Sequence, residues 1–191
     1  ERVLRQIEAI ETLRPHLLDF TLLAGIEVDI LGDGSLDLDD EVLEQLDLVV
    51  ASVHSRFQQD MATMTSRIIA ALENPHVDIL GHATGRRLGH RDPYQIDVEA
   101  VLDAAVRTRT VVEINASPER LDLPDVDVRR GKDKGLRFAV NSDAHSVAGL
   151  DVLHFGVMTA RRGWLEAADV VNTKPAGDVA AFFARPKAER W

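Results

Sequence analysis

The feature that most constrains this chain is a repeated order of short apolar runs and amphipathic segments. The apolar runs predict strands over Leu22–Ile30, Leu48–Val53, Val77–Leu80, Thr110–Ile114 and Leu136–Val140, with a weaker sixth over His154–Met158. Helical spacing of apolar residues is found over Glu1–Leu13, Asp40–Leu46, Asp60–Leu72 and Asp97–Thr108, and in a short segment after Ser146. Strands that alternate with helices predict an α/β fold with a parallel sheet, either open or closed into a barrel.

Composition narrows the class of protein further. The chain has 191 residues, 45% of them hydrophobic, which is typical of one globular domain over residues 1–191. We expect its tail, Asp178–Trp191, to be a helix followed by a frayed end. The chain has no cysteine, which excludes disulfide scaffolds, zinc ribbons and thiol nucleophiles. No apolar run approaches the roughly 18 residues that a membrane span needs, so we expect no membrane contact and a cytoplasmic location.

The charge balance bears on possible partners. With 22 basic and 32 acidic residues, the formal net charge is −10, which disfavours general attraction to a nucleic-acid backbone. Divalent cations neutralise acidic residues that gather around them, so the formal charge overstates the repulsion inside a metal site.

The most informative pattern is a polar side chain in or just after each predicted strand. These side chains are, in order, Glu27 in GIEVDI, His54 in ASVHS, His82 in DILGHATGR, Asn115 in EINASP, and Asp143 and His145 in NSDAH. In a parallel α/β fold the carboxyl ends of the strands converge on one site. Histidine and carboxylate ligands together suit Zn²⁺, Mn²⁺ or Fe²⁺, ions that lower the pKa of bound water and polarise phosphoryl oxygens.

Each of these residues also has a simpler interpretation. Taken alone, His54 is more typical of a hydrogen-bonded core histidine. For Glu27, a salt bridge is as good an interpretation as metal ligation. Asp143 is in a position to cap a following helix, and His82 follows a glycine in a turn. Five such coincidences at successive strand ends are improbable together, so the pattern favours a metal site.

Basic residues supply candidates for substrate binding. Arg86 and Arg87 closely follow the His82 loop, and His90 lies in a loop beside the predicted site. For these arginines, a solvated surface and a phosphate contact are equally good interpretations. A denser basic cluster over 129–137 is more typical of a solvated face. No nucleotide-binding glycine loop and no Gly-x-Ser-x-Gly motif occurs.

In this order, GIEVDI, SVHS, GHATGR, EINASP and NSDAHS resemble the polymerase and histidinol phosphatase (PHP) superfamily of metal-dependent phosphoesterases. More narrowly, SVHSRF, EINASPERLDLPD and RRGWLEAADVVNT are similar to the C-terminal PHP domain of bacterial X-family DNA polymerases. The resemblance implies a distorted (β/α)7 barrel with up to three divalent metals, Zn²⁺ or Mn²⁺.

The resemblance also implies a role for each matching residue. Glu27 corresponds to a carboxylate that bridges two metals, His54 to a ligand of that pair, and Asp143 to the aspartate that completes it. These three are therefore the expected catalytic centre. His82 and His145 resemble ligands of the third metal, and Asn115 lies at the same rim, where we group it with the substrate-binding candidates.

The chain departs from the family pattern at one point. The family motifs begin with a His-x-His strand followed by an Asp-His pair, and neither is present here. The resemblance therefore predicts an N-terminally incomplete PHP domain whose first strands lie outside these residues. Its implied function is hydrolysis of DNA 3′ ends in repair: 3′–5′ exonuclease activity, with 3′-phosphatase or abasic-site cleavage in some members.

The partners implied are single-stranded DNA 3′ ends and polymerase domains in cis. Two alternatives remain open: a free-standing phosphatase acting on a small ester such as histidinol phosphate, and a non-catalytic scaffold.

Overall fold

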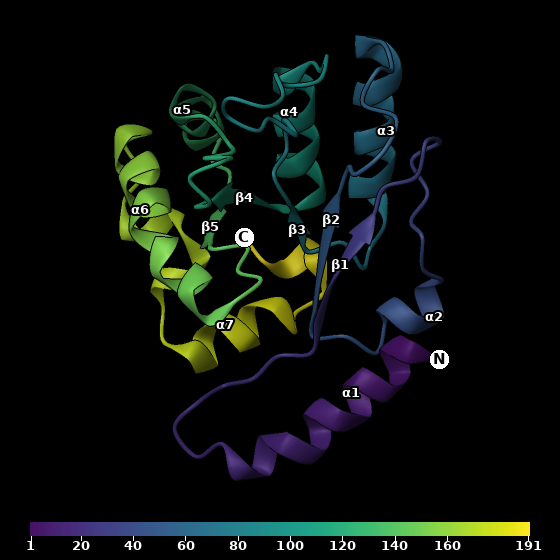
Figure 1. Ribbon diagram of the computed structural model, residues 1–191, viewed down its shortest axis with the longest axis vertical. Helices are drawn as coiled ribbons and strands as arrows, with labels where there is room; N and C mark the ends of the chain where they lie inside the picture. Colours follow the sequence, from purple (N-terminus) through teal and green to yellow (C-terminus); the bar gives the residue numbers. More distant parts are fainter.

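The structure, a computed structural model of residues 1–191, is built on one parallel five-stranded sheet with the strand order β1-β2-β3-β4-β5 (Figure 1). Its strands are β1 (Gly25–Asp29), β2 (Leu48–Ser52), β3 (Ile79–Leu80), β4 (Val111–Asn115) and β5 (Phe138–Asn141). Each strand pairs in parallel with the next one along the chain. The predicted α/β class with a parallel sheet is confirmed.

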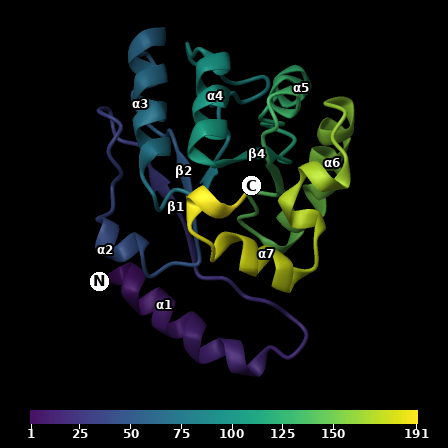
Figure 2. The ribbon, with the colours of Figure 1, turned by 180° about the vertical axis from the view of Figure 1, so that it is seen from behind.

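Seven α-helices accompany the sheet: α1 (Arg2–Leu13), α2 (Asp40–Leu43), α3 (Met61–Glu73), α4 (Val98–Thr108), α5 (Asp125–Asp133), α6 (Leu153–Arg162) and α7 (Ala176–Phe183). Helices α3 to α6 stand side by side, and α7 crosses below them (Figures 1 and 2). Helix α1 lies apart at the bottom and buries none of its residues. No helix is both long and apolar enough to cross a membrane.

The two faces of the sheet have different partners because successive side chains of a strand point to opposite sides. On one face, Val28, Ala51 and Val112 belong to the main core together with apolar residues of α3 and α4. On the other face, Ile79, Val111 and Ala139 pack with Phe182 and Phe183 of α7. Further along the strands this second face becomes polar, and it carries the candidate site.

Two helices begin at a side-chain cap that the sequence shows in advance. Asp60 accepts a hydrogen bond from the backbone of Thr63 at the start of α3, and Asp97 accepts one from Ala100 at the start of α4. Such caps satisfy backbone donors that have no partner within the helix. The helices predicted from Asp60 and Asp97 are therefore found, with those residues as caps.

Three details of the prediction are wrong. The run His154–Met158 lies in α6 and not in a sixth strand, because a short apolar run suits a half-buried helix as well as a strand. Helix α5 is not among the predicted helices, although its acidic first turn and basic last turn are a signal for one. The chain end is also not frayed, since Arg190 is buried and Trp191 stacks on Phe182.

The sheet does not close on itself. No pairing joins β1 to β5, and beyond β5 the chain adds only an isolated bridge between Phe138 and Val170. Beside that bridge, the side-chain amide of Asn172 donates to the carbonyl of Val140 and accepts from its N–H, which satisfies part of the β5 edge. The structure thus contains an open five-stranded sheet, and the closed (β/α)7 barrel stays a prediction.

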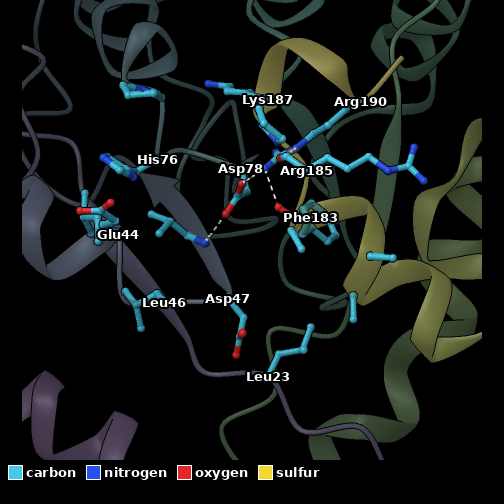
Figure 3. Close-up of a pocket in the computed structure, with 17 residues that line it drawn as sticks. Leu23, Glu44, Leu46, Asp47, His76, Asp78, Phe183, Arg185, Lys187 and Arg190 are labelled. Atoms are coloured by element: carbon cyan, nitrogen blue, oxygen red, sulfur yellow. Dashed lines mark hydrogen bonds and ion pairs between the residues drawn. The ribbon is translucent and has the colours of Figure 1, made fainter.

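The chain end is held at the opposite end of the strands from the candidate site. There, Asp78, Lys187 and Arg190 line a cavity of about 830 Å³ between the β2–β3 region and the segment after α7 (Figure 3). Arg190 donates from Nη2 to Oδ1 of Asp78 at 2.5 Å, and both side chains are less than a tenth exposed. This buried ion pair joins the chain terminus to the start of β3.

Candidate metal centre

Three of the predicted ligands meet at the carboxyl end of the sheet. Glu27 lies on β1, His54 follows β2 and His82 follows β3. Oε1 of Glu27 is 2.9 Å from Nε2 of His82 and 3.3 Å from Nε2 of His54, and the two histidine nitrogens are 3.3 Å apart. This is a group of one carboxylate and two imidazoles with ligand atoms close enough to share one ion.

The backbone at His82 depends on the glycine before it. A Cβ at Gly81 would overlap Oγ of Ser52 and lie 2.8 Å from a methyl group of Val50, so no larger residue fits beside β2. His82 itself has a φ of +25°, which is uncommon for a residue other than glycine. This combination turns the His82 ring, itself almost fully buried, toward Glu27.

Asp29 adjoins this group, although the sequence patterns did not single it out. Its Oδ1 lies 2.6 Å from Nδ1 of His54, on the side of the ring opposite the nitrogen that faces Glu27. A carboxylate in this place fixes the tautomer and the orientation of a metal-binding histidine. A signal was available, because Asp29 is two residues after Glu27 and therefore on the same face of the strand.

We expect Asp29→Asn to weaken binding of Mn²⁺ by about 10- to 100-fold, the usual effect of losing the partner of a ligating histidine. The reason is that an amide no longer selects the His54 tautomer with a free Nε2. Titration with Mn²⁺ measures the change, and Asp33→Asn, an exposed carboxylate in the next loop, is the control. Equal affinity in the two variants contradicts a role for Asp29.

Electrostatics couple these groups. Hydrogen bonding to Glu27 and then to Asp29 raises the pKa of His54 to about 9, against the opposing effect of burial. Burial favours the neutral form of Glu27, but hydrogen bonds from His54 and His82 outweigh it and hold the pKa of Glu27 well below its usual range. Without a metal, the positive charge of protonated His54 is what balances the Glu27 carboxylate, so a cation and this proton compete for the same place.

The remaining predicted ligands lie beside this group and not in it. Oδ2 of Asp143 is 3.1 Å from the side-chain amide of Asn115, which is fully buried, and 3.5 Å from Nε of Arg120. Asp143 does not cap the next helical turn, since Ser146 does so. The His145 side chain is 87% exposed, and its Nδ1 is 2.9 Å from the backbone oxygen of Asp143.

The predicted substrate-binding arginines have different surroundings. Arg86 donates to the backbone carbonyls of Arg120 and Leu121, and thereby ties the His82 loop to the loop after β4. Arg87 is exposed and paired with Glu119, and His90 is exposed in the same loop. The basic cluster over 129–137 makes ion pairs with acidic neighbours, as a solvated face does.

Arg120 was not among the candidates, and no pattern in the sequence singles it out. Its Nη1 is shielded from solvent and has no hydrogen-bond partner, while its Nε faces Asp143. A buried donor without a partner is unusual in a native structure and points to a group that is absent from the protein alone.

A parallel sheet that brings a carboxylate and two histidines together at the carboxyl ends of its strands is typical of metal-dependent hydrolases. Comparison with known proteins is consistent with this class. The chain is 42% identical over 185 residues to the DNA polymerase/3′-5′ exonuclease PolX of Bacillus subtilis, a match that covers 97% of this chain and 32% of PolX.

Smaller proteins match as well. A probable phosphatase of Caldanaerobacter subterraneus subsp. tengcongensis is 36% identical over 140 residues, covering 65% of this chain and 50% of the phosphatase. A probable phosphatase of Thermoanaerobacter sp. (strain X514) is 37% identical over 134 residues, covering 65% of this chain and 52% of the phosphatase. This chain thus spans about a third of PolX and about half of these phosphatases. No protein-family model matches it.

The ordered motifs and these relatives together place the chain in the PHP superfamily, with a specific likeness to the X-family DNA polymerases. The resemblance seen in the sequence is confirmed.

Proposed function

We propose that this chain is the phosphoesterase part of an X-family DNA polymerase and that it hydrolyses DNA 3′ ends in repair. The observation that carries the proposal is the Glu27–His54–His82 group, set at the strand ends of a chain that matches PolX over 97% of its length. The 3′–5′ exonuclease reaction is the principal activity proposed, with 3′-phosphatase or abasic-site cleavage as variants of the same chemistry.

The side chains present fit a divalent metal. Glu27, His54 and His82 offer one oxygen and two nitrogens within 4.8 Å of one another, and Asp29 contacts Nδ1 of His54 so that Nε2 faces the other two side chains. Asp143 and His145 stand next to them as ligands for further ions. When bound, Zn²⁺ or Mn²⁺ supplies a Lewis acid for the phosphoryl oxygen and lowers the pKa of water.

Binding of an anionic substrate is assigned to the neighbouring loops. Arg120 faces Asp143 and has a buried N–H donor without a partner. Burial lowers the pKa of Arg91, and the charges of the nearby Arg120 and Arg87 lower it further. These arginines make a positive region at one side of the rim in a protein with a net charge of −10. A phosphodiester is the ligand that matches it, with Arg86, Arg87 and His90 as further contacts. Asn115 is fully buried against Asp143, so its side chain does not reach a substrate.

The test is a direct comparison of substrates with metal-stripped protein to which Mn²⁺ is returned. We expect release of nucleotides from the 3′ end of single-stranded DNA, faster than hydrolysis of a small phosphomonoester. The reverse order favours the second candidate, a small-ester phosphatase, to which the matching phosphatases give weight. Absence of both reactions, with Mn²⁺ not bound, favours a scaffold.

We expect Arg120→Met to lower kcat/KM for DNA by about 10- to 100-fold, because a hydrogen bond to a charged group contributes roughly 1.5–3 kcal/mol. Affinity for Mn²⁺ should not fall, since the arginine's charge disfavours a cation at Asp143. Steady-state kinetics and a metal titration measure the two effects. Arg107→Met, which removes an exposed arginine paired with Glu73, is the control; the same kcat/KM in both variants contradicts the assignment.

A further inference from the structure

A second acidic residue lies directly beneath the metal group and is not one of its ligands. Glu113 is on β4, points to the same face of the sheet as Asn115, and is only 5% exposed. Its Oε2 accepts hydrogen bonds from the backbone N–H of His82 at 2.8 Å and from Nδ2 of Asn115 at 3.1 Å. Its Oε1 accepts one from Nδ2 of Asn141 at 2.9 Å.

These donors come from three neighbouring strands. His82 follows β3, Asn115 ends β4 and Asn141 ends β5, so one carboxylate connects the ends of all three. The network continues outward, because Nδ2 of Asn115 also donates to Oδ2 of Asp143 at 3.1 Å. Glu113 is thus one hydrogen bond from the backbone of His82 and two from the carboxylate of Asp143.

Both of these rim residues have an unfavourable backbone. His82 has a φ of +25° and Asp143 a φ of +54°. Such conformations persist at residues other than glycine only when the surroundings enforce them. Contacts with Glu113, directly for His82 and through Asn115 for Asp143, are part of that enforcement.

We propose that Glu113 is a positioning residue of the metal site, holding His82 through its backbone and Asp143 through Asn115. The inference rests on the metal-dependent function proposed above. It also gives Asn115 a role, since its amide bridges the two carboxylates.

Glu113→Gln tests the proposal while keeping the shape of the side chain. One carboxylate oxygen becomes an NH₂ group that faces other N–H donors, which misaligns the strand ends. We expect the Mn²⁺ dissociation constant to rise by about 10- to 100-fold, as for other residues that orient metal ligands. Asp78→Asn is the matched control, because it neutralises another buried carboxylate, on the segment leading into β3, at the far end of the strands. It should leave that constant unchanged.

A compensating change makes the test specific. In the double variant Glu113→Gln/Asn141→Asp, the new amide donates to the new carboxylate, and the remaining side-chain oxygen at position 113 stays available to His82 and Asn115. We expect the double variant to recover most of the lost affinity. Wild-type affinity in Glu113→Gln, or a loss no greater than that in Asp78→Asn, overturns the proposal. If Glu113→Gln does not fold, wild-type affinity in Asn115→Ala overturns it instead.

The readout separates this inference from the proposed function. A wild-type chain that binds Mn²⁺ but leaves DNA intact contradicts the proposed substrate only, and the role of Glu113 is then still read from the affinities. A wild-type chain that binds no Mn²⁺ overturns both.

Discussion

Arg190→Met is expected to lower the free energy of unfolding by roughly 3–5 kcal/mol, the usual effect of removing one partner from a buried ion pair. The variant leaves the Asp78 carboxylate, with its side chain 8% exposed, without its ion-pair partner. The backbone N–H of Val49 still donates to Asp78 at 2.8 Å and the charge of Lys187 is nearby, but neither replaces the hydrogen-bonded guanidinium. The whole free energy of unfolding of a domain is about 5–15 kcal/mol, so the expected loss is a large fraction of it.

Urea unfolding measures this effect, and Arg185→Met is the control, because Arg185 is an exposed arginine five residues earlier. The pH dependence adds a second check. Burial raises the pKa of Asp78, and the nearby Arg190 opposes that effect. Without Arg190 the folded-state pKa rises further above the unfolded value, so the folded variant binds more protons and loses stability as pH rises through that pKa.

The destabilisation should therefore be smaller at pH 4 than at pH 7. A loss below about 1 kcal/mol at pH 7, typical of a surface pair, contradicts the structural role given to the chain end.

His54→Ala is expected to abolish tight binding of Mn²⁺ and to lower phosphoesterase activity by more than about 100-fold, because loss of a ligand exceeds the 10- to 100-fold effect of losing a ligand's partner. His54 contacts the three other side chains of the site: its Nε2 faces Glu27 and His82, and its Nδ1 faces Asp29. Alanine removes the nitrogen ligand and leaves two carboxylates facing each other across the gap.

The control for His54→Ala is His16→Ala, which removes an exposed histidine just after α1. Metal content after dialysis and the rate of nucleotide release from single-stranded DNA are the two measurements. Full activity in His54→Ala contradicts the metal site. Loss of activity with unchanged metal content contradicts ligation by His54 but leaves a role in substrate contact.

The sequence by itself determined the α/β class with a parallel sheet, the five strands along the chain and the residues that stand at their carboxyl ends. It could do so because strand and helix periodicity are local properties, and because parallel strands place their carboxyl ends at one edge whatever the details of packing. Glu27, His54 and His82 were therefore found from position alone.

Only the tertiary structure decided which neighbours these residues have. Glu113 meets the backbone of His82 through the register of paired strands, and Arg120 meets Asp143 through the packing of two loops; no local pattern records either contact. For Asp29, the spacing from Glu27 shows the shared strand face, but only the pairing of β1 with β2 shows that it meets His54. The same reason explains the helix at His154–Met158 and the buried Arg190. A short apolar run and a terminal arginine acquire their conformation from the residues they pack against, and those residues are distant in the sequence.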